Sequence, residues 1–295
     1  MKRLLALVLA LAFVATASAQ KTISLEGADE TVRLWDNTTA KHSNYETRDE
    51  AWRKGKKTSA VRTSTCELYI FKADTEKNTG AAVVMYPGGG YTTLNFSVAT
   101  ARWYASLGIT AVLVKYRLPN YGHTEATIED AMGAVRYIRT RTDLGIDPTK
   151  VGVSGSSAGG HLAAWVSNVM PDDEKPAFAI LHFPWINLSK GVTPTEGRAL
   201  FQFLGKNYCY QDALDLSLHT MVTSTTPPTL LMLCNDDDVV PSTNSTAYYK
   251  ALSQHGVKAS LHIYPKGGHS LKNYTKEYKS NIIDWLDWLK ITNND

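Results

Sequence analysis

The chain has 295 residues, of which 43% are hydrophobic and 20% charged, the balance of a folded globular protein. Its 31 Lys and Arg face 28 Asp and Glu, which gives a formal net charge of +3. A charge so close to neutral, without a dense basic cluster, argues against binding to nucleic acid or to an anionic membrane surface.

Residues 1–19 carry the three parts of a secretory signal peptide. Lys2 and Arg3 precede an apolar run, and a small-residue Ala-Ser-Ala site ends it at Ala19. The run is too short for a membrane anchor, and a buried N-terminal helix is the alternative. We therefore expect an exported protein, periplasmic or extracellular, in which residues 20–295 form a single large domain. Loss of the two basic residues would lower its net charge from +3 to +1.

Three cysteines, Cys66, Cys209 and Cys234, are an odd number without C-x-x-C spacing or histidine partners. One disulfide bridge is compatible with export, whereas a disulfide framework is not predicted. Cys234 ends an apolar segment, where a cysteine usually packs as a small hydrophobic residue. The sequence predicts no metal ion and no organic cofactor.

The first predicted strands precede residue 87. Residues 31–35 alternate between apolar and polar types, which predicts an edge strand, and the polar stretch 36–57 predicts an exposed connection. Residues 66–71 form a second strand. Residues 81–86 are continuously apolar, as in a strand buried on both faces of a central sheet.

Three consecutive glycines follow this strand, in the sequence Pro87-Gly88-Gly89-Gly90-Tyr91. Glycines at the end of a strand let the backbone turn its N–H groups toward a neighbouring pocket, which is what an oxyanion site requires. A tight turn without any chemistry is the alternative.

Strands and helices then alternate. Residues 98–107 predict a helix closed by Gly108, residues 109–114 a buried strand, and residues 128–141 a second helix. Residues 151–154 are the next strand. This alternation implies a parallel sheet with right-handed crossovers.

The strand at 151–154 runs into Gly155-Ser156-Ser157-Ala158-Gly159, which fits the pattern G-x-S-x-G with Ser157 as nucleophile. The pattern has physical meaning only as a strand, a sharp turn and a helix, and apolar residues at helical spacing follow it. Gly155 and Gly159 leave room where a β-carbon would collide with the neighbouring strand or helix.

Residues 177–183 predict another strand, and a long excursion follows over 184–228, which we name the cap segment. A connection of that length at the carboxyl edge of such a sheet is usually functional. Its aromatic residues fit a small cap over a pocket. A helical excursion packed against the flank of the domain explains them equally well.

Two further strands end in polar loops. Residues 229–234 lead into the acidic run Asp236-Asp237-Asp238, and residues 259–264 lead into Gly267-Gly268-His269. A helix around 248–255 separates them, and an amphipathic helix with apolar residues from 282 to 289 closes the chain.

Ser157, Asp237 and His269 follow the order serine, acid, histidine, each just beyond the carboxyl end of a predicted strand. A serine hydroxyl needs a base to remove its proton, and the base needs a third group to hold its tautomer. Other histidines compete for the base role. We expect His161 to support the site or to lie on the helix surface, and His182 to be a satisfied core side chain.

The chain resembles the α/β-hydrolase superfamily across nearly all of residues 20–295. The matching motifs occur in the family's order: Pro87 to Tyr91, Gly155 to Gly160, Asp237 to Pro241, and Gly267 to His269. More narrowly, it is similar to bacterial secreted esterases related to acetylxylan esterases and to the hormone-sensitive-lipase group. Pro87 stands where the family usually has a histidine.

This resemblance implies an α/β-hydrolase fold, with a mostly parallel sheet and helices on both faces. It implies that the N–H groups of Gly89, Gly90 and Ala158 stabilise an oxyanion. The Asp-x-x-Val-Pro motif implies that Asp237 is the acid, and the acidic run as a cation site is the less economical interpretation.

The predicted function is a secreted serine esterase with an acyl-enzyme mechanism, acting on a small-molecule or polysaccharide ester. A carbohydrate O-acetylesterase similar to acetylxylan esterases is the favoured substrate class. The alternatives are a prolyl-oligopeptidase-type peptidase, a feruloyl or aryl esterase, and an inactive glycan-binding protein of the same fold. No nucleic-acid partner is expected.

Overall fold

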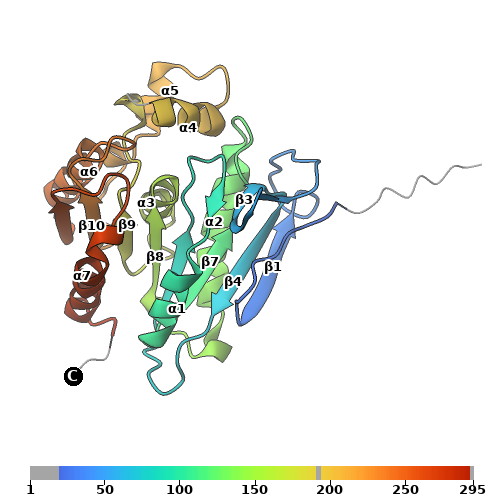
Figure 1. Ribbon diagram of the computed structural model, residues 1–295. Coiled ribbons are helices and arrows are strands. Elements are labelled where there is room, and N and C mark those ends of the chain that lie inside the picture. Colours follow the sequence, from blue (N-terminus) through green and yellow to red (C-terminus); the bar gives the residue numbers. More distant parts are fainter. Residues whose placement is uncertain (1–19, 191–193, 293–295) are drawn as a thin grey trace, which may run out of the picture.

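An eight-stranded sheet forms the centre of the computed structural model, which describes residues 20–190 and 194–292 (Figure 1). The predicted signal segment, residues 1–19, lies outside the described residues. The strand order is β1-β4-β7-β5-β8-β9-β10-β11. The strands are β1 Glu30–Asp36, β4 Thr65–Phe71, β5 Ala82–Tyr86, β7 Thr110–Lys115, β8 Val151–Ser156, β9 Ala179–His182, β10 Thr229–Cys234 and β11 Ala259–Tyr264.

The sheet is mostly parallel, as predicted. From β7 to β11, every neighbouring pair is parallel, whereas β4 runs antiparallel to both β1 and β7. Strands β5, β7 and β10 are buried along their whole length, in agreement with their continuous apolar runs. Strand β1 is an edge strand with alternating exposure, which confirms the prediction for residues 31–35.

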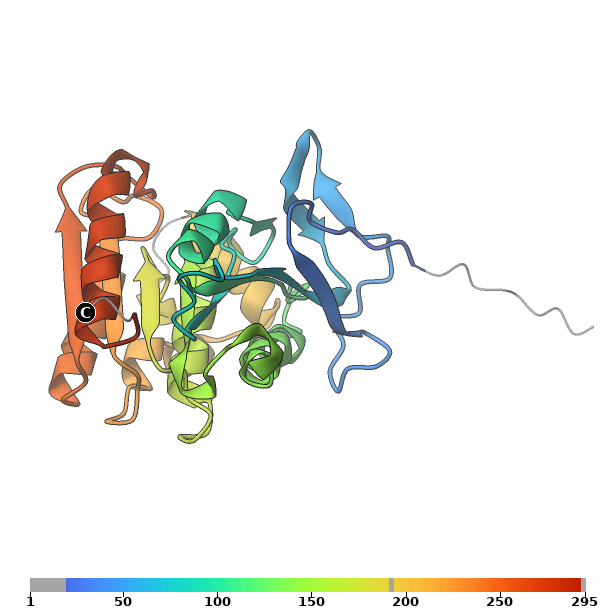
Figure 2. The same ribbon diagram turned by 90° about the horizontal axis from the view of Figure 1, so that it is seen from below.

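Helices cover both faces of the sheet (Figure 2). Helices α1 (Val98–Ser106) and α7 (Thr275–Trp288) lie on one face. Helices α2 (Thr124–Arg139), α3 (Ala158–Val169) and α6 (Thr243–Gln254) lie on the other. None of the helices in the described part of the chain has the length and apolarity to span a membrane.

The prediction of an exposed connection over 36–57 holds only in part: many of these residues are exposed, but the stretch is not a simple connection. This stretch contains strand β2 (Ala51–Arg53) and the start of β3 (Lys56–Arg62), which pair with β6 (Leu94–Asn95) in a second, three-stranded sheet. Glu50 is buried, and an ion pair of 2.6 Å with Lys115 of β7 balances the charge of its carboxylate. The polar composition of the stretch reflects buried ion pairs as well as exposure to solvent.

The described residues of the cap segment form two α-helices, α4 (Pro194–Leu204) and α5 (Tyr210–Asp215), which lie above the carboxyl ends of the strands (Figure 1). Phe203 of α4 stacks on Tyr91, with ring centroids 4.7 Å apart. The segment thus packs on the loop that follows β5. The three cysteines are free thiols: Cys66 and Cys234 are buried and Cys209 is exposed.

Candidate active site

Ser157 lies at a sharp turn between β8 and α3. Its backbone has φ 55° and ψ −123°, a conformation that a non-glycine residue adopts only under strain. A β-carbon at Gly155 would lie 2.1 Å from the carbonyl oxygen of Gly159, and one at Gly159 would lie 2.0 Å from that of Tyr86. The prediction that these two glycines are needed for space is confirmed.

His269 and Asp237 are directly paired. His269 Nδ1 lies 2.7 Å from Asp237 Oδ2, while Asp237 Oδ1 accepts hydrogen bonds of 2.9 Å from the N–H groups of Val239 and Val240. The Asp237 side chain is fully buried, and that of His269 is 20% exposed. A carboxylate that accepts from Nδ1 leaves the other ring nitrogen, Nε2, with a lone pair for use as a base.

The neighbouring aspartates have other contacts. Asp236 Oδ1 accepts hydrogen bonds of 2.8 and 2.9 Å from the N–H groups of Gly267 and Gly268, so it fixes the loop that carries His269. Asp238 is exposed. Within the described ranges, no group of three or more His, Cys, Asp or Glu side chains is arranged to hold a metal ion.

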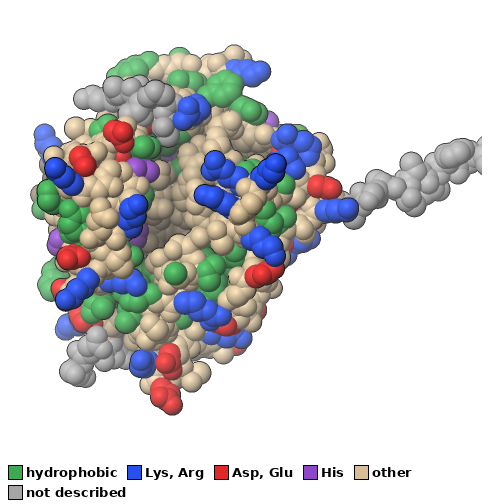
Figure 3. Space-filling model, viewed as in Figure 1, with side chains coloured by type: hydrophobic (Ala, Val, Ile, Leu, Met, Phe, Trp, Pro, Cys, Tyr) green, Lys and Arg blue, Asp and Glu red, His purple; other side chains and the backbone are tan. Residues whose placement is uncertain are grey.

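Ser157 and His269 line one cavity of about 280 Å³, together with the glycine loop, Phe183 and Arg198. No hydrogen bond joins the two side chains among the described residues. Such contacts are often long in hydrolases without bound substrate and shorten when the reaction complex forms. Figure 3 shows a hollow at the centre of the face that carries α1 and α7.

The glycine loop lines the same cavity. Gly89 has φ 141° and Gly90 has φ 58°, which are conformations that favour glycine. Within the described part of the chain, neither amide N–H donates to a protein acceptor. Ala158 is the first residue of α3, where the amide N–H has no partner inside the helix. Three N–H groups are thus left unused by the helix and the loop: two belong to residues that line the cavity of Ser157, and the third belongs to the residue that follows it.

Two tyrosines hold the glycine loop. The Tyr116 hydroxyl donates to the Pro87 carbonyl at 2.8 Å, and the Tyr91 hydroxyl lies 2.7 Å from His161 Nδ1. His161 is fully buried between Tyr91, Trp185 and Phe203. Burial lowers the pKa of His161 to about 3. The alternative that His161 lies on the helix surface is therefore wrong, because α3 is covered on that side by the cap segment.

His182 differs from the prediction in another way. It ends β9, but its Nε2 atom is buried without a hydrogen-bond partner among the described residues. Burial lowers the pKa of this side chain to about 4. The expectation of a satisfied core histidine is wrong, because the side chain lines a cavity.

Two residues of the cavity have no signal in the sequence. The Phe183 ring packs on His269, with centroids 4.5 Å apart, and its φ of 37° is unusual for a phenylalanine. In the sequence it is one more apolar residue at the end of a strand. Arg198 reaches the cavity from α4, and nothing in the cap segment distinguishes it from other exposed basic residues.

Comparison with known proteins agrees with the fold. Residues 83–273 match the family model of the alpha/beta hydrolase fold. The chain is 33% identical over 226 residues to an acetylxylan esterase of Xylanibacter ruminicola. The aligned region covers 73% of this chain and 46% of that relative. The chain thus spans about half the length of this relative.

Solved structures are also similar. An acetyl ester-xyloside bifunctional hydrolase of Caldicellulosiruptor lactoaceticus superposes with a TM-score of 0.71 and 33% identity, over 78% of this chain and 90% of the other. A carboxylesterase of Lactobacillus plantarum has the same fold, with a TM-score of 0.67 and 20% identity over 78% of this chain and 94% of the other.

Proposed function

Because the chain belongs to the α/β-hydrolase fold family, we propose that it is a serine esterase whose nucleophile is Ser157. One observation carries the proposal: His269, paired with Asp237 at 2.7 Å, lines the same cavity as a serine on a strained turn. Such a turn raises a hydroxyl above the edge of a sheet, where a base can reach it.

The reaction follows from this chemistry. His269 Nε2 takes the Ser157 proton as the hydroxyl oxygen attacks the ester carbonyl, and Asp237 stabilises the imidazolium that forms. The tetrahedral intermediate expels the alcohol, which receives the proton from His269. Water, activated by the same imidazole, then hydrolyses the acyl-enzyme and regenerates Ser157.

The negative charge on the tetrahedral oxygen needs donors that are already in position. The N–H groups of Gly89, Gly90 and Ala158 are our candidates, because no acceptor among the described residues occupies them. Donors of this kind each contribute about 10² to 10³ in kcat in serine hydrolases. Tyr116 and Tyr91 hold the loop by their hydroxyl groups.

For the substrate, we propose an O-acetyl ester on a xylan-like glycan. Support comes from the 33% identity with an acetylxylan esterase and with an acetyl ester-xyloside hydrolase. The cavity at Ser157, about 280 Å³, is at the small end of ligand pockets, which suits a short acyl group better than a long lipid chain.

We also propose that the protein is exported and that residues 1–19 are removed. Expression in a bacterium with a secretory system, followed by mass spectrometry of the exported protein, should find a chain that begins at Gln20. A cell-associated chain that keeps Met1 would contradict this proposal.

The esterase proposal is tested by covalent labelling and by a substrate series. A fluorophosphonate should label the wild type and not Ser157→Ala, and peptide mapping should find the adduct on Ser157. We expect faster turnover of 4-nitrophenyl acetate than of the octanoate, and release of acetate from acetylated xylan. Faster octanoate turnover would contradict the acetylesterase proposal, and cleavage of a Pro-containing peptide would favour the peptidase alternative. Absence of labelling would indicate an inactive protein of this fold.

A further inference from the structure

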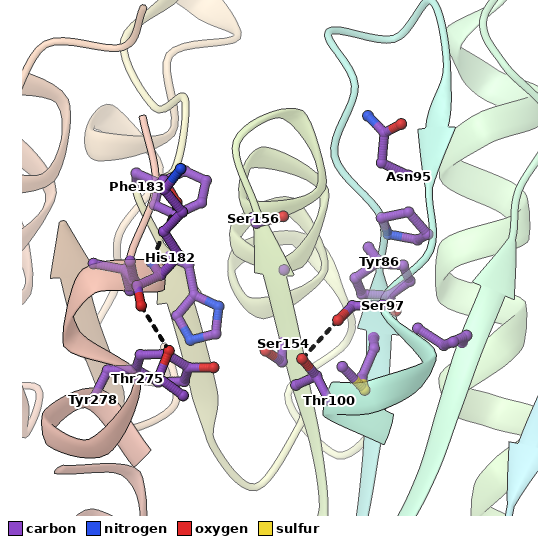
Figure 4. A pocket seen from close by; sticks show the side chains of 17 residues that line it. Tyr86, Asn95, Ser97, Thr100, Ser154, Ser156, His182, Phe183, Thr275 and Tyr278 are labelled. Carbon is purple, nitrogen blue, oxygen red and sulfur yellow. Dashed lines mark hydrogen bonds between the residues drawn. The ribbon is translucent and has the colours of Figure 1, made fainter. Parts of the chain in front are cut away.

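A second cavity lies beside the catalytic one, on the face of the sheet that carries α1 and α7. Its volume is about 330 Å³. Helix α1 packs on β7 and helix α7 packs on β10, so strands β5, β8 and β9 between them provide the floor. Figure 4 shows the side chains of floor and walls around this space.

The register of the sheet places polar side chains on this floor. Ser154 and Ser156 are two residues apart in β8 and therefore point to the same face of the sheet. Ser156 pairs with His182 of β9, and Ser154 pairs with Met85 of β5. Two hydroxyls and an imidazole thus occupy central strands, where such sheets normally carry apolar side chains beneath a helix.

His182 is the group on this floor that needs a partner. Its ring points into the cavity (Figure 4), and its buried Nε2 atom makes no hydrogen bond with any described residue. The lowered pKa, about 4, keeps the imidazole neutral at physiological pH. Buried polar atoms without a partner are uncommon in folded proteins, and a ligand hydroxyl group would satisfy this one.

The walls are also rich in hydroxyl groups. Ser97 and Thr100 come from the α1 side, where their hydroxyls share a hydrogen bond of 2.7 Å, and Thr275 and Tyr278 come from α7 (Figure 4). Among the described residues that line the cavity, Lys272 alone carries a charge, and it is exposed. This lining suits a neutral ligand with several hydroxyl groups.

The two cavities share walls. Asn95, Ser156 and Phe183 line both of them, and the Phe183 ring packs on that of His269. A ligand in the second cavity would therefore lie directly beside an ester bound at Ser157.

We propose that the cavity between α1 and α7 is a glycan subsite that binds one sugar ring next to the acetylated one. This inference rests on the proposed esterase function. A sugar ring combines apolar ring faces with hydroxyl groups around its edge, and the cavity combines Tyr278, Met85 and Leu113 with the hydroxyls and imidazole described above. Its size, at the lower end of ligand pockets, suits a single ring.

The test uses a variant that closes the cavity from its rim. Thr275 is exposed, so Thr275→Trp places a large ring at the opening without disturbing the floor. We expect the affinity for xylotriose, measured by calorimetry, to fall by about tenfold or more. We also expect kcat/KM to fall about tenfold more on acetylated xylotriose than on 4-nitrophenyl acetate. His182→Phe should weaken xylotriose binding in the same direction.

Ser280→Trp is the matched control, because Ser280 is exposed on the same helix but does not line the cavity. It should leave binding and turnover as in the wild type. The subsite proposal would be overturned if the wild type did not bind xylotriose, or if Thr275→Trp bound it as tightly as the wild type. Binding of ferulic acid would also overturn the subsite if Thr275→Trp blocked it while xylotriose still bound. The cavity would then hold the acyl group of the ester.

Failure of the esterase proposal has a different signature. In that case the wild type would not hydrolyse 4-nitrophenyl acetate and Ser157 would not be labelled, whatever the result of the xylotriose titration. Normal turnover and labelling without xylotriose binding would reject the subsite alone.

Discussion

At the scale of single residues, the three consecutive aspartates 236–238 make different contacts with their side chains. Asp237 binds the His269 ring, Asp236 binds the backbone of the histidine loop, and Asp238 is exposed. The family motif selects Asp237 from the sequence, but the motif does not reveal the contact of Asp236. Two acids thus support one histidine, one through its ring and one through its loop.

We expect Asp237→Asn to lower kcat by about 10⁴, because an amide cannot stabilise the imidazolium and favours the wrong tautomer of His269. Asp236→Asn keeps an oxygen that can accept hydrogen bonds from the loop amides, so it should lower kcat by roughly tenfold at most. Steady-state kinetics on 4-nitrophenyl acetate measure both values. Asp238→Asn is the control and should match the wild type, and equal losses at 236 and 237 would contradict the assignment.

The turn between β8 and α3 belongs to the scale of elements, because three backbone segments meet there. The carbonyl oxygen of Tyr86, at the end of β5, lies 2.0 Å from the position that a β-carbon of Gly159 would take. The positions of the nucleophile and of the glycine loop are therefore linked by packing.

Gly159→Ala should destabilise the protein by about 1–3 kcal/mol, since the new methyl group must displace backbone. It should also lower kcat, because the displaced backbone carries Ser157 and the glycine loop. Gly197→Ala provides a matched control: no atom lies within 4 Å of its added β-carbon, and in helix α4 the change should stabilise by roughly 0.5–1 kcal/mol. Urea denaturation measures both effects. Wild-type stability and turnover in Gly159→Ala would show that the contact is readily relieved.

A second feature at the scale of elements is the segment between β1 and β3, which a buried ion pair attaches to the central sheet. Lys115 Nζ lies 2.6 Å from Glu50 and 3.0 Å from Glu67, with both lysine and Glu50 side chains fully buried. Burial by itself would raise the pKa of the Glu50 carboxyl. The Lys115 charge and hydrogen bonds from backbone N–H groups outweigh this effect, so the pKa lies below its usual value. Glu50 is therefore ionised at neutral pH.

Glu50→Ala should destabilise the protein by about 3–5 kcal/mol, because it removes one of the two carboxylates that balance a buried ammonium group. Glu26→Ala removes a partner of Lys57 in a pair that is exposed on both sides, and it should change the stability by less than about 1 kcal/mol. The free energy of unfolding in urea at pH 7 compares the two. Similar small losses would mean that water reaches Lys115.

At the scale of the whole molecule, the cap segment buries a histidine that couples stability to pH. His161 is covered by Phe203 and Trp185, and its folded-state pKa is about 3 against 6.5 for an unperturbed imidazole. Below pH 6.5 the unfolded chain binds a proton at this position that the folded chain does not. Stability is complete above pH 6.5 and falls as the pH decreases toward 3.

Between pH 7 and pH 5, the pKa difference at His161 should lower the free energy of unfolding of the wild type by about 2 kcal/mol. His161→Gln cannot take up the proton, so its free energy of unfolding should fall by about 2 kcal/mol less over the same range. His255→Gln, at an exposed position, is the control and should follow the wild type. Parallel pH curves for His161→Gln and the wild type would refute the linkage.

The sequence by itself determined the order of the strands along the chain and the loops that end them. Hydrophobic periodicity and glycine-rich turns are local properties, and the carboxyl ends of parallel strands gather at one edge. Hence the residue pattern predicts that Ser157, His269, the glycine loop and one carboxylate of the acidic run 236–238 lie together, and the resemblance to the family selects Asp237 from that run.

Only the tertiary structure decided which polar side chains are buried. Glu50 is 65 residues from Lys115 in the sequence, and His161 is covered by a cap segment whose position no local pattern specifies. His182 faces a cavity because α1 and α7 pack on separate strands. Burial of a polar group depends on partners that are distant in sequence, and a periodic pattern contains no information about them.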